Sequence, residues 1–218
     1  MLALVPLAVL FTAGFQSQVR DVFVGQAFPS PWVDPGFKRF VWIGSPNFGR
    51  RPNGPDTVVD TVVVHATAIP TLEQTAHAFY TKASRVSAHF TIGKDGSIVQ
   101  SVSTFSRAWH AGASRDWRGR DNVNNFSIGI ELVNMDDGQD PYPDAQIEAL
   151  KSLIRSLARL HPLRYLTSHE FIALPHGRKV DPNGFPWSKL DELGLRTDHA
   201  GLPPGVPVLE SLLQSRNE

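Results

Sequence analysis

The chain has 218 residues, of which 41% are hydrophobic and 19% charged, as in an ordinary globular protein of one domain with extensions. Its 21 basic and 21 acidic residues cancel, so the formal net charge is zero. The charge balance therefore does not indicate nucleic acid or an anionic bilayer as the main partner. Cysteine is absent, which excludes disulfides, thiolate metal ligands, a cysteine nucleophile and anchoring through a lipidated cysteine.

The first 15 residues are apolar and uncharged, and the polar segment 16–20 follows them. This run is shorter than the about 20 residues of a transmembrane helix, and residues 12–14 offer small side chains for cleavage. Residues 1–18 are therefore predicted to be the signal sequence of an exported protein, periplasmic or secreted, with no stable membrane insertion after processing. A basic segment before the apolar run is missing, so a buried first helix or strand is the alternative.

Composition divides the rest of the chain into three parts. Residues 19–56 are rich in proline, glycine and aromatics and are predicted to be a loop-rich extension with one short strand near residues 37–43. Residues 57–194 show the pattern of an α/β domain. Residues 195–218 are predicted to be a polar tail with a short amphipathic segment at 208–213.

Strand and helix patterns alternate along the predicted domain. The β-branched run 57–65 is apolar apart from Asp60, and a helix is expected after it, where Thr71 and Gln74 could form a capping box. The expected elements are strand 57–65, helix 71–82, a hairpin of 87–92 with 97–102, strand 127–133, helix 143–160 and a short helix at 187–193.

Two histidines and an aspartate form the candidate metal site. His65 ends the first apolar strand, where active sites of α/β proteins open, and His169 and Asp181 follow the long helix in the predicted loop. Two imidazoles and one carboxylate can hold zinc and leave a fourth position for water. The spacing itself is a weak signal, because it lacks a local signature of the kind that a helical zinc motif has.

An acid and a lysine accompany the candidate ligands. Glu131 ends the apolar run 126–131, where an unpaired acidic side chain would be costly to bury. Lys179 stands two residues before Asp181. A metal, a base and a cation suffice to hydrolyse an amide.

Six sequence blocks occur in an order that resembles a known family. They are Val62–Thr67 (VVVHAT), Ser87–Phe90 (SAHF), Asp95–Gln100 (DGSIVQ), Ala108–Gly112 (AWHAG), Ser127–Leu132 (SIGIEL) and Lys179–Pro182 (KVDP). Their succession, over about residues 57–190, resembles the zinc-dependent N-acetylmuramoyl-L-alanine amidases of the type 2 amidase family, related to bacteriophage T7 lysozyme and peptidoglycan recognition proteins.

The resemblance implies a fold, an activity and a set of partners. The expected fold is a single α/β domain with a central mixed β-sheet flanked by helices. The expected reaction is hydrolysis of the amide between N-acetylmuramic acid and L-alanine of the stem peptide. It implies one Zn²⁺ per chain and peptidoglycan or muropeptide fragments as partners, with the protein a monomer.

The resemblance also implies roles for single residues. His65, His169 and Asp181 match the zinc ligands, Glu131 matches the general base, and Lys179 matches the cation that stabilises the oxyanion. A general base contributes typically about 10²–10⁴-fold to the rate.

Further histidines lie near these blocks. Trp109 and His110 are expected to line the substrate groove, although His110 could equally be structural. His89 is expected to be structural or to orient a ligand. The segment 169–181 is slightly longer than in similar family members, which makes His176 an alternative metal ligand. The remaining three, His77, His161 and His199, are expected to face solvent.

Other functions remain open on sequence alone. A non-catalytic peptidoglycan-recognition module would keep the groove without a complete metal site. A cytoplasmic amidase restricted to anhydro-muropeptides is opposed by the apolar N-terminus, and a phage-type lytic enzyme is a further alternative. Arg115, Trp117 and Arg118 could contact carboxylates of the stem peptide, or form a solvated loop.

Overall fold

The computed structural model describes residues 40–197, so the predicted signal sequence, the segment 208–213 and His199 lie outside the described residues. Two sheets are formed within this range. Their strands are β1 (Phe40–Trp42), β2 (Phe48–Arg50), β3 (Thr61–Ala66), β4 (Phe90–Ile92), β5 (Ile98–Gln100), β6 (Ser106–Ala108), β7 (Ser127–Leu132), β8 (Tyr165–Ser168) and β9 (Arg196–Thr197). The helices are α2 (Leu72–Tyr80), α3 (Asp144–Ala158), the one-turn α4 (His169–Ile172), and the 3₁₀ helices η2 (Gly54–Asp56), η3 (Lys82–Ser84), η4 (Val123–Asn125) and η5 (Trp187–Leu193).

The main sheet is mixed, as predicted, with the strand order β1-β5-β4-β7-β3-β8-β9. Strands β4, β7, β3, β8 and β9 run parallel to their neighbours in this order, while β5 pairs antiparallel with β4 and parallel with β1. A separate small sheet pairs β2 with β6. All six residues of β3 are buried, which is the burial expected of a strand covered on both faces.

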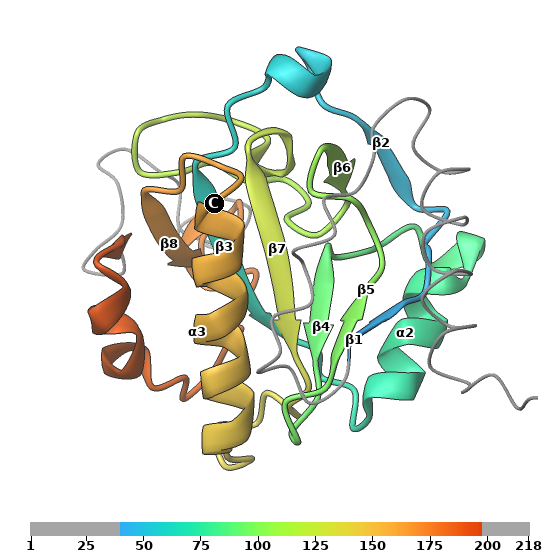
Figure 1. Cartoon of the computed structure of the whole chain (residues 1–218), viewed down its shortest axis with the longest axis vertical. Coiled ribbons are helices and arrows are strands. Elements are labelled where there is room, and N and C mark those ends of the chain that lie inside the picture. Colours follow the sequence, from blue (N-terminus) through green and yellow to red (C-terminus); the bar gives the residue numbers. More distant parts are fainter. Residues whose placement is uncertain (1–39, 198–218) are drawn as a thin grey trace, which may run out of the picture. The chain divides into compact units, whose positions relative to one another are not determined.

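Helices flank the sheet: in Figure 1 α3 runs in front, nearly parallel to β7, while α2 lies to the right of β1 and β5. The predicted apolar stripe of α3 is buried through Ile147, Leu150, Ile154 and Leu157. At the start of α2, the Thr71 hydroxyl accepts a hydrogen bond from the Gln74 amide at 3.2 Å, which is the Thr71 half of the predicted capping box. None of the helices between residues 40 and 197 combines the length and apolar character that crossing a bilayer requires.

Three expectations about the elements were wrong. The first buried strand begins at Thr61 rather than at residue 57. His169 does not lie in a loop after the long helix, because the unpredicted strand β8 precedes it and pairs with β3. His161 does not face solvent: it is buried, and its Nε2 lies 2.8 Å from the Thr104 hydroxyl, a partner 57 residues away in the sequence. His77 is exposed, as predicted.

Both arginines that the sequence offered for substrate binding form ion pairs within the protein: Arg115 with Asp121 at 2.7 Å, and Arg118 with the buried carboxylate of Asp60. Arg118 and Arg120 lie 3.1 and 3.0 Å from the Asp60 carboxylate, and both also reach Asp116. Trp117 packs edge-on against Tyr165 at 5.0 Å. These side chains therefore stabilise the loop after Gly112, because a buried carboxylate requires charged partners.

Candidate metal centre

Three neighbouring parallel strands end at one edge of the sheet, and each supplies a functional residue. In the β3–β7 register His65 is the partner of Glu131. In the β3–β8 register Val64 is the partner of Ser168, and His169 follows directly. Carboxyl ends of parallel strands form the usual site of α/β proteins.

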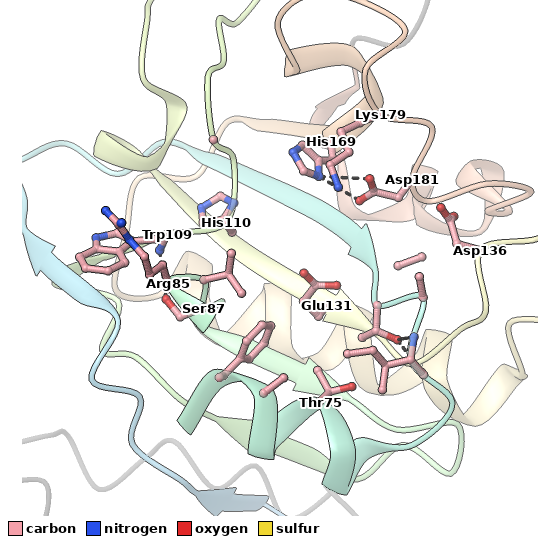
Figure 2. Close-up of a pocket in the computed structure, with 18 of the residues that line it drawn as sticks. Thr75, Arg85, Ser87, Trp109, His110, Glu131, Asp136, His169, Lys179 and Asp181 are labelled. Atoms are coloured by element: carbon pink, nitrogen blue, oxygen red, sulfur yellow. Dashed lines mark hydrogen bonds and ion pairs between the residues drawn. The ribbon is translucent and has the colours of Figure 1, made fainter. Parts of the chain in front are cut away.

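Asp181 completes a compact group with the two histidines, and Figure 2 shows it beside His169. The Asp181 carboxylate lies 3.1 Å from Nδ1 of His169 and 3.3 Å from Nδ1 of His65. The Glu170 amide donates to the Asp181 carbonyl at 3.0 Å and fixes the loop beside α4. All three residues are buried, and their ligand atoms lie within 4.8 Å of one another.

This geometry fits a tetrahedral zinc ion. Nitrogen and oxygen ligands at their usual distances from zinc are separated by about 3.4 Å at the tetrahedral angle. The measured separations of 3.1 and 3.3 Å are close to this value. Two imidazoles and one carboxylate are also the donor set of catalytic zinc sites, so the residues present can hold the ion that the sequence predicted.

The protonation of the group suits a metal ligand set. Burial alone would raise the pKa of Asp181, but hydrogen bonds to His169 and His65 outweigh it and hold that pKa well below its ordinary range. Burial lowers the pKa of His65 to about 4, with Asp181 opposing and His169 adding to the shift. An ionised carboxylate and a neutral imidazole are the forms that bind zinc.

Glu131 lies beside the group, and its buried Oε2 atom has no hydrogen-bond partner in the part of the chain that the structure describes. Burial and the charge of Asp181 raise its pKa to about 8, against the opposing charge of Lys179. Figure 2 shows the Glu131 side chain in the wall of the cavity. A carboxyl group with a raised pKa in a cleft is a candidate for proton transfer.

The cavity around these residues measures about 400 Å³. Trp109 and His110, the two residues expected in the groove, line it together with Lys179, Glu131, His169 and Asp181. Its lining also includes residues that the sequence did not single out, among them Thr75, Phe79, Arg85, Asp136 and Arg178. The only sequence signal for the two arginines was their place beside the blocks Ser87–Phe90 and Lys179–Pro182.

The other histidines lie outside the metal group. The imidazole of His176 is buried but is not a member of the group that the described residues form. His89 accepts a hydrogen bond from the Gly129 amide on Nδ1 at 3.0 Å, which suits the structural role predicted for it. His110 lies between Trp109 and the metal group in Figure 2, and its Nδ1 is 3.0 Å from Nε2 of His65.

A buried His-His-Asp group beside an acid and a lysine, at the strand ends of an α/β sheet, is the arrangement of a metal hydrolase. The model of the family described as N-acetylmuramoyl-L-alanine amidase matches residues 55–184. The chain therefore belongs to the N-acetylmuramoyl-L-alanine amidase family, and the fold and the hydrolase activity expected from the sequence are confirmed.

Individual relatives agree with the family assignment. The 1,6-anhydro-N-acetylmuramyl-L-alanine amidase AmpD of Escherichia coli K12 is 36% identical over 167 residues, which are 67% of this chain and 87% of that protein. A crystal structure of AmpD superposes with a TM-score of 0.58 at 32% identity and covers 72% of this chain and 94% of AmpD. The amidase AmiD of E. coli, in complex with anhydro-N-acetylmuramic acid-L-Ala-D-γ-Glu-L-Lys, gives a TM-score of 0.55 at 31% identity over 63% of this chain and 58% of AmiD.

Proposed function

We propose that this chain is an exported zinc amidase that separates L-alanine of the stem peptide from N-acetylmuramic acid, including its 1,6-anhydro form. The observation that carries the proposal is the group of His65, His169 and Asp181, of which His169 and Asp181 line a cavity together with Glu131 and Lys179. The anhydro sugar in the name of AmpD and in the AmiD complex supports soluble muropeptides as substrates.

His65, His169 and Asp181 would hold the zinc ion. When bound, zinc polarises the substrate carbonyl and lowers the pKa of a coordinated water to about 7. Because His169 and Asp181 line the cavity, the scissile amide can approach the group from the cavity. Burial keeps both imidazoles in a position that side chains on flexible loops would not maintain.

Glu131 takes a proton from the attacking water and returns it to the amine of L-alanine as that group leaves. Its Oε2 atom is buried and has no hydrogen-bond partner among residues 40–197, which leaves the atom available for this transfer. Lys179 carries a positive charge on the same cavity, where it stabilises the negative charge that develops on the carbonyl oxygen. Removing one such donor costs about 3 kcal/mol of transition-state stabilisation in comparable sites.

The cavity also offers cations to the acidic stem peptide. Arg85 and Arg178 both line it, and Arg178 is fixed by hydrogen bonds to the carbonyls of Leu174 and Ala113 at 2.8 and 3.0 Å. The peptide in the AmiD complex contains D-γ-Glu, whose α-carboxylate is free. A guanidinium held in place can bind such a carboxylate with little loss of side-chain entropy.

Turnover separates this proposal from a non-catalytic recognition module. Calorimetry of muropeptide binding and chromatography of the products should be run on the same protein, with zinc and after chelation. Release of free peptide only with zinc supports the amidase. Tight binding without any release of peptide in the presence of zinc would refute it.

Export is supported by the apolar, uncharged residues 1–15. Fractionation of the native host, followed by N-terminal sequencing of the recovered protein, tests it: a periplasmic or secreted protein shortened near residue 18 is expected. Full-length protein in the cytoplasm would contradict export and favour a cytoplasmic amidase. Light scattering of the purified protein tests the expected monomer.

A further inference from the structure

His110 occupies a space that the sheet provides for it. A Cβ atom built on Gly129 of β7 would lie 2.4 Å from Cγ of His110, a distance that real Cβ atoms do not show. The backbone of the residue is fixed as well, because Oδ1 of Asn124 accepts hydrogen bonds from the amides of His110 and Ala111 at 3.1 and 2.9 Å. A glycine inside a strand often marks such a close approach.

The proton of the His110 imidazole can be assigned from its two partners. The hydroxyl of Ser127 donates to the carbonyl of Val123 at 2.6 Å, so its oxygen is an acceptor toward Nε2 of His110 at 3.2 Å. A neutral imidazole carries one N–H group, and the Ser127 oxygen requires it on Nε2. Nδ1 of His110 is therefore an acceptor.

The acceptor faces a metal ligand. Nδ1 of His110 lies 3.0 Å from Nε2 of His65, so His65 carries its proton on Nε2 and donates it to His110. This leaves the lone pair of His65 on Nδ1, the atom that lies 3.3 Å from the Asp181 carboxylate in the metal group. The hydrogen bond at one ring nitrogen decides which form the other takes.

We propose that His110 is a positioning residue, which holds His65 in the tautomer and orientation that bind zinc through Nδ1. The inference rests on the proposed zinc site and extends it by a residue outside the ligand set. The usual partner of a zinc-binding histidine is a carboxylate, a carbonyl or water. Here a second imidazole takes that place, and Ser127 in turn holds that imidazole.

The two histidine ligands differ in this respect. Nε2 of His169 is buried and has no hydrogen-bond partner among the described residues, whereas Nε2 of His65 has His110. The protein therefore fixes the tautomer of His65 from outside the ligand set. Loss of His110 should weaken zinc binding through His65 alone.

Zinc affinity tests the role without relying on turnover. His110→Phe removes the acceptor and keeps a planar ring, whereas His110→Asn restores an acceptor oxygen near the place of Nδ1. His161→Phe is the matched control, because it also removes a buried imidazole bonded to a hydroxyl, at a site outside the metal group. Competition with a chelator gives the zinc dissociation constant, and thermal melting of the metal-free proteins reports folding.

We expect His110→Phe to weaken zinc binding by about 10- to 100-fold, the usual cost of losing an outer-shell partner. His110→Asn should recover most of this loss, and His161→Phe should lower the melting temperature without changing zinc affinity. Wild-type affinity in His110→Phe would overturn the role. So would a loss of affinity in His161→Phe equal to that in His110→Phe, which would show a general effect of destabilisation.

Nitrogen-15 spectra of the zinc-loaded wild-type protein test the assignment even if the His110 variants do not fold. The proton of His110 is expected on Nε2, with Nδ1 unprotonated, and a proton on Nδ1 would overturn the inference. The two proposals fail separately. If the wild-type protein binds zinc and releases peptide while His110→Phe binds zinc equally well, only the role of His110 falls; if the wild-type protein binds no zinc, the proposed function falls as well.

Discussion

The substitution Glu131→Gln should make the metal-free protein more stable and the zinc-loaded protein nearly inactive. Glutamine keeps the shape of the side chain and removes its charge and its capacity to take up a proton. The native carboxyl group is costly to ionise, because it is buried beside Asp181 and its Oε2 atom has no hydrogen-bond partner within the described range. Catalytic groups are often kept at such a cost in stability.

The size of the stability effect follows from the pKa of Glu131, which is about 8 in the folded protein against an ordinary value of 4.5. Between these values the folded state binds more protons than the unfolded state, so stability falls as pH rises through this window. The penalty is about 1 kcal/mol at pH 5 and reaches an upper limit of about 5 kcal/mol at pH 9. Glutamine removes this penalty, so its advantage should grow with pH.

Turnover should change in the opposite direction. Loss of a general base lowers the rate by about 10²–10⁴-fold, or roughly 3–5 kcal/mol in activation free energy. Zinc affinity should stay close to that of the wild-type protein, because Glu131 is not a member of the metal group.

Urea unfolding in the presence of a chelator at pH 5 and pH 9, with turnover measured separately in zinc, tests both parts. Glu73→Gln, at an exposed site in α2, is the control and should change neither quantity. The reasoning is refuted if Glu131→Gln is equally active, or if its stability relative to wild type is the same at both pH values.

Three further substitutions test the site and its supports. Removal of an outer-shell partner weakens metal binding by up to about 100-fold, and Asp181→Ala should weaken zinc binding by more than this. Full zinc occupancy in this variant would instead point to His176 as a ligand. Arg51 is buried and donates to the carbonyls of Thr104, Asn125 and Ser127 at 2.9 Å each. The substitution Arg51→Met should therefore lower the free energy of unfolding by about 3–5 kcal/mol. A change below 1 kcal/mol in a urea titration would contradict this. Burial and the charge of Arg51 lower the pKa of His161 to about 4 from 6.5. The neutral imidazole therefore contributes fully to the free energy of unfolding above pH 6.5, and this contribution is lost as the pH falls to 4. His161→Gln should remove about 3 kcal/mol of this acid sensitivity, which parallel titrations at pH 7 and pH 4 would reveal.

Long periodic elements could be predicted from the sequence, because their signal is local. The apolar stripe of α3, the hairpin of β4 and β5 and the buried strand β7 each show their pattern within a few consecutive residues. Strands β2, β6, β8 and β9 could not be predicted. They have two to four residues each, and partners far away in the sequence determine them.

The same distinction holds for the site. A family resemblance in the sequence predicted that His65, His169 and Asp181 form one site, and the structure shows these residues adjacent. Their roles, and those of Glu131 and Lys179, stay predictions. The hydrogen bond between His65 and His110 spans 45 residues and depends on the space above Gly129. No spacing in the sequence indicates it.

Mass spectrometry of the products from a defined anhydro-muropeptide tests the central claim most directly. The protein should be stripped of metal and assayed alone, with one equivalent of zinc, and with zinc and excess chelator. The account predicts free stem peptide beginning with L-alanine and intact anhydro-N-acetylmuramic acid, formed only when zinc is available. Equal cleavage without zinc, or cleavage at any bond other than the one between the sugar's lactyl group and L-alanine, would contradict it.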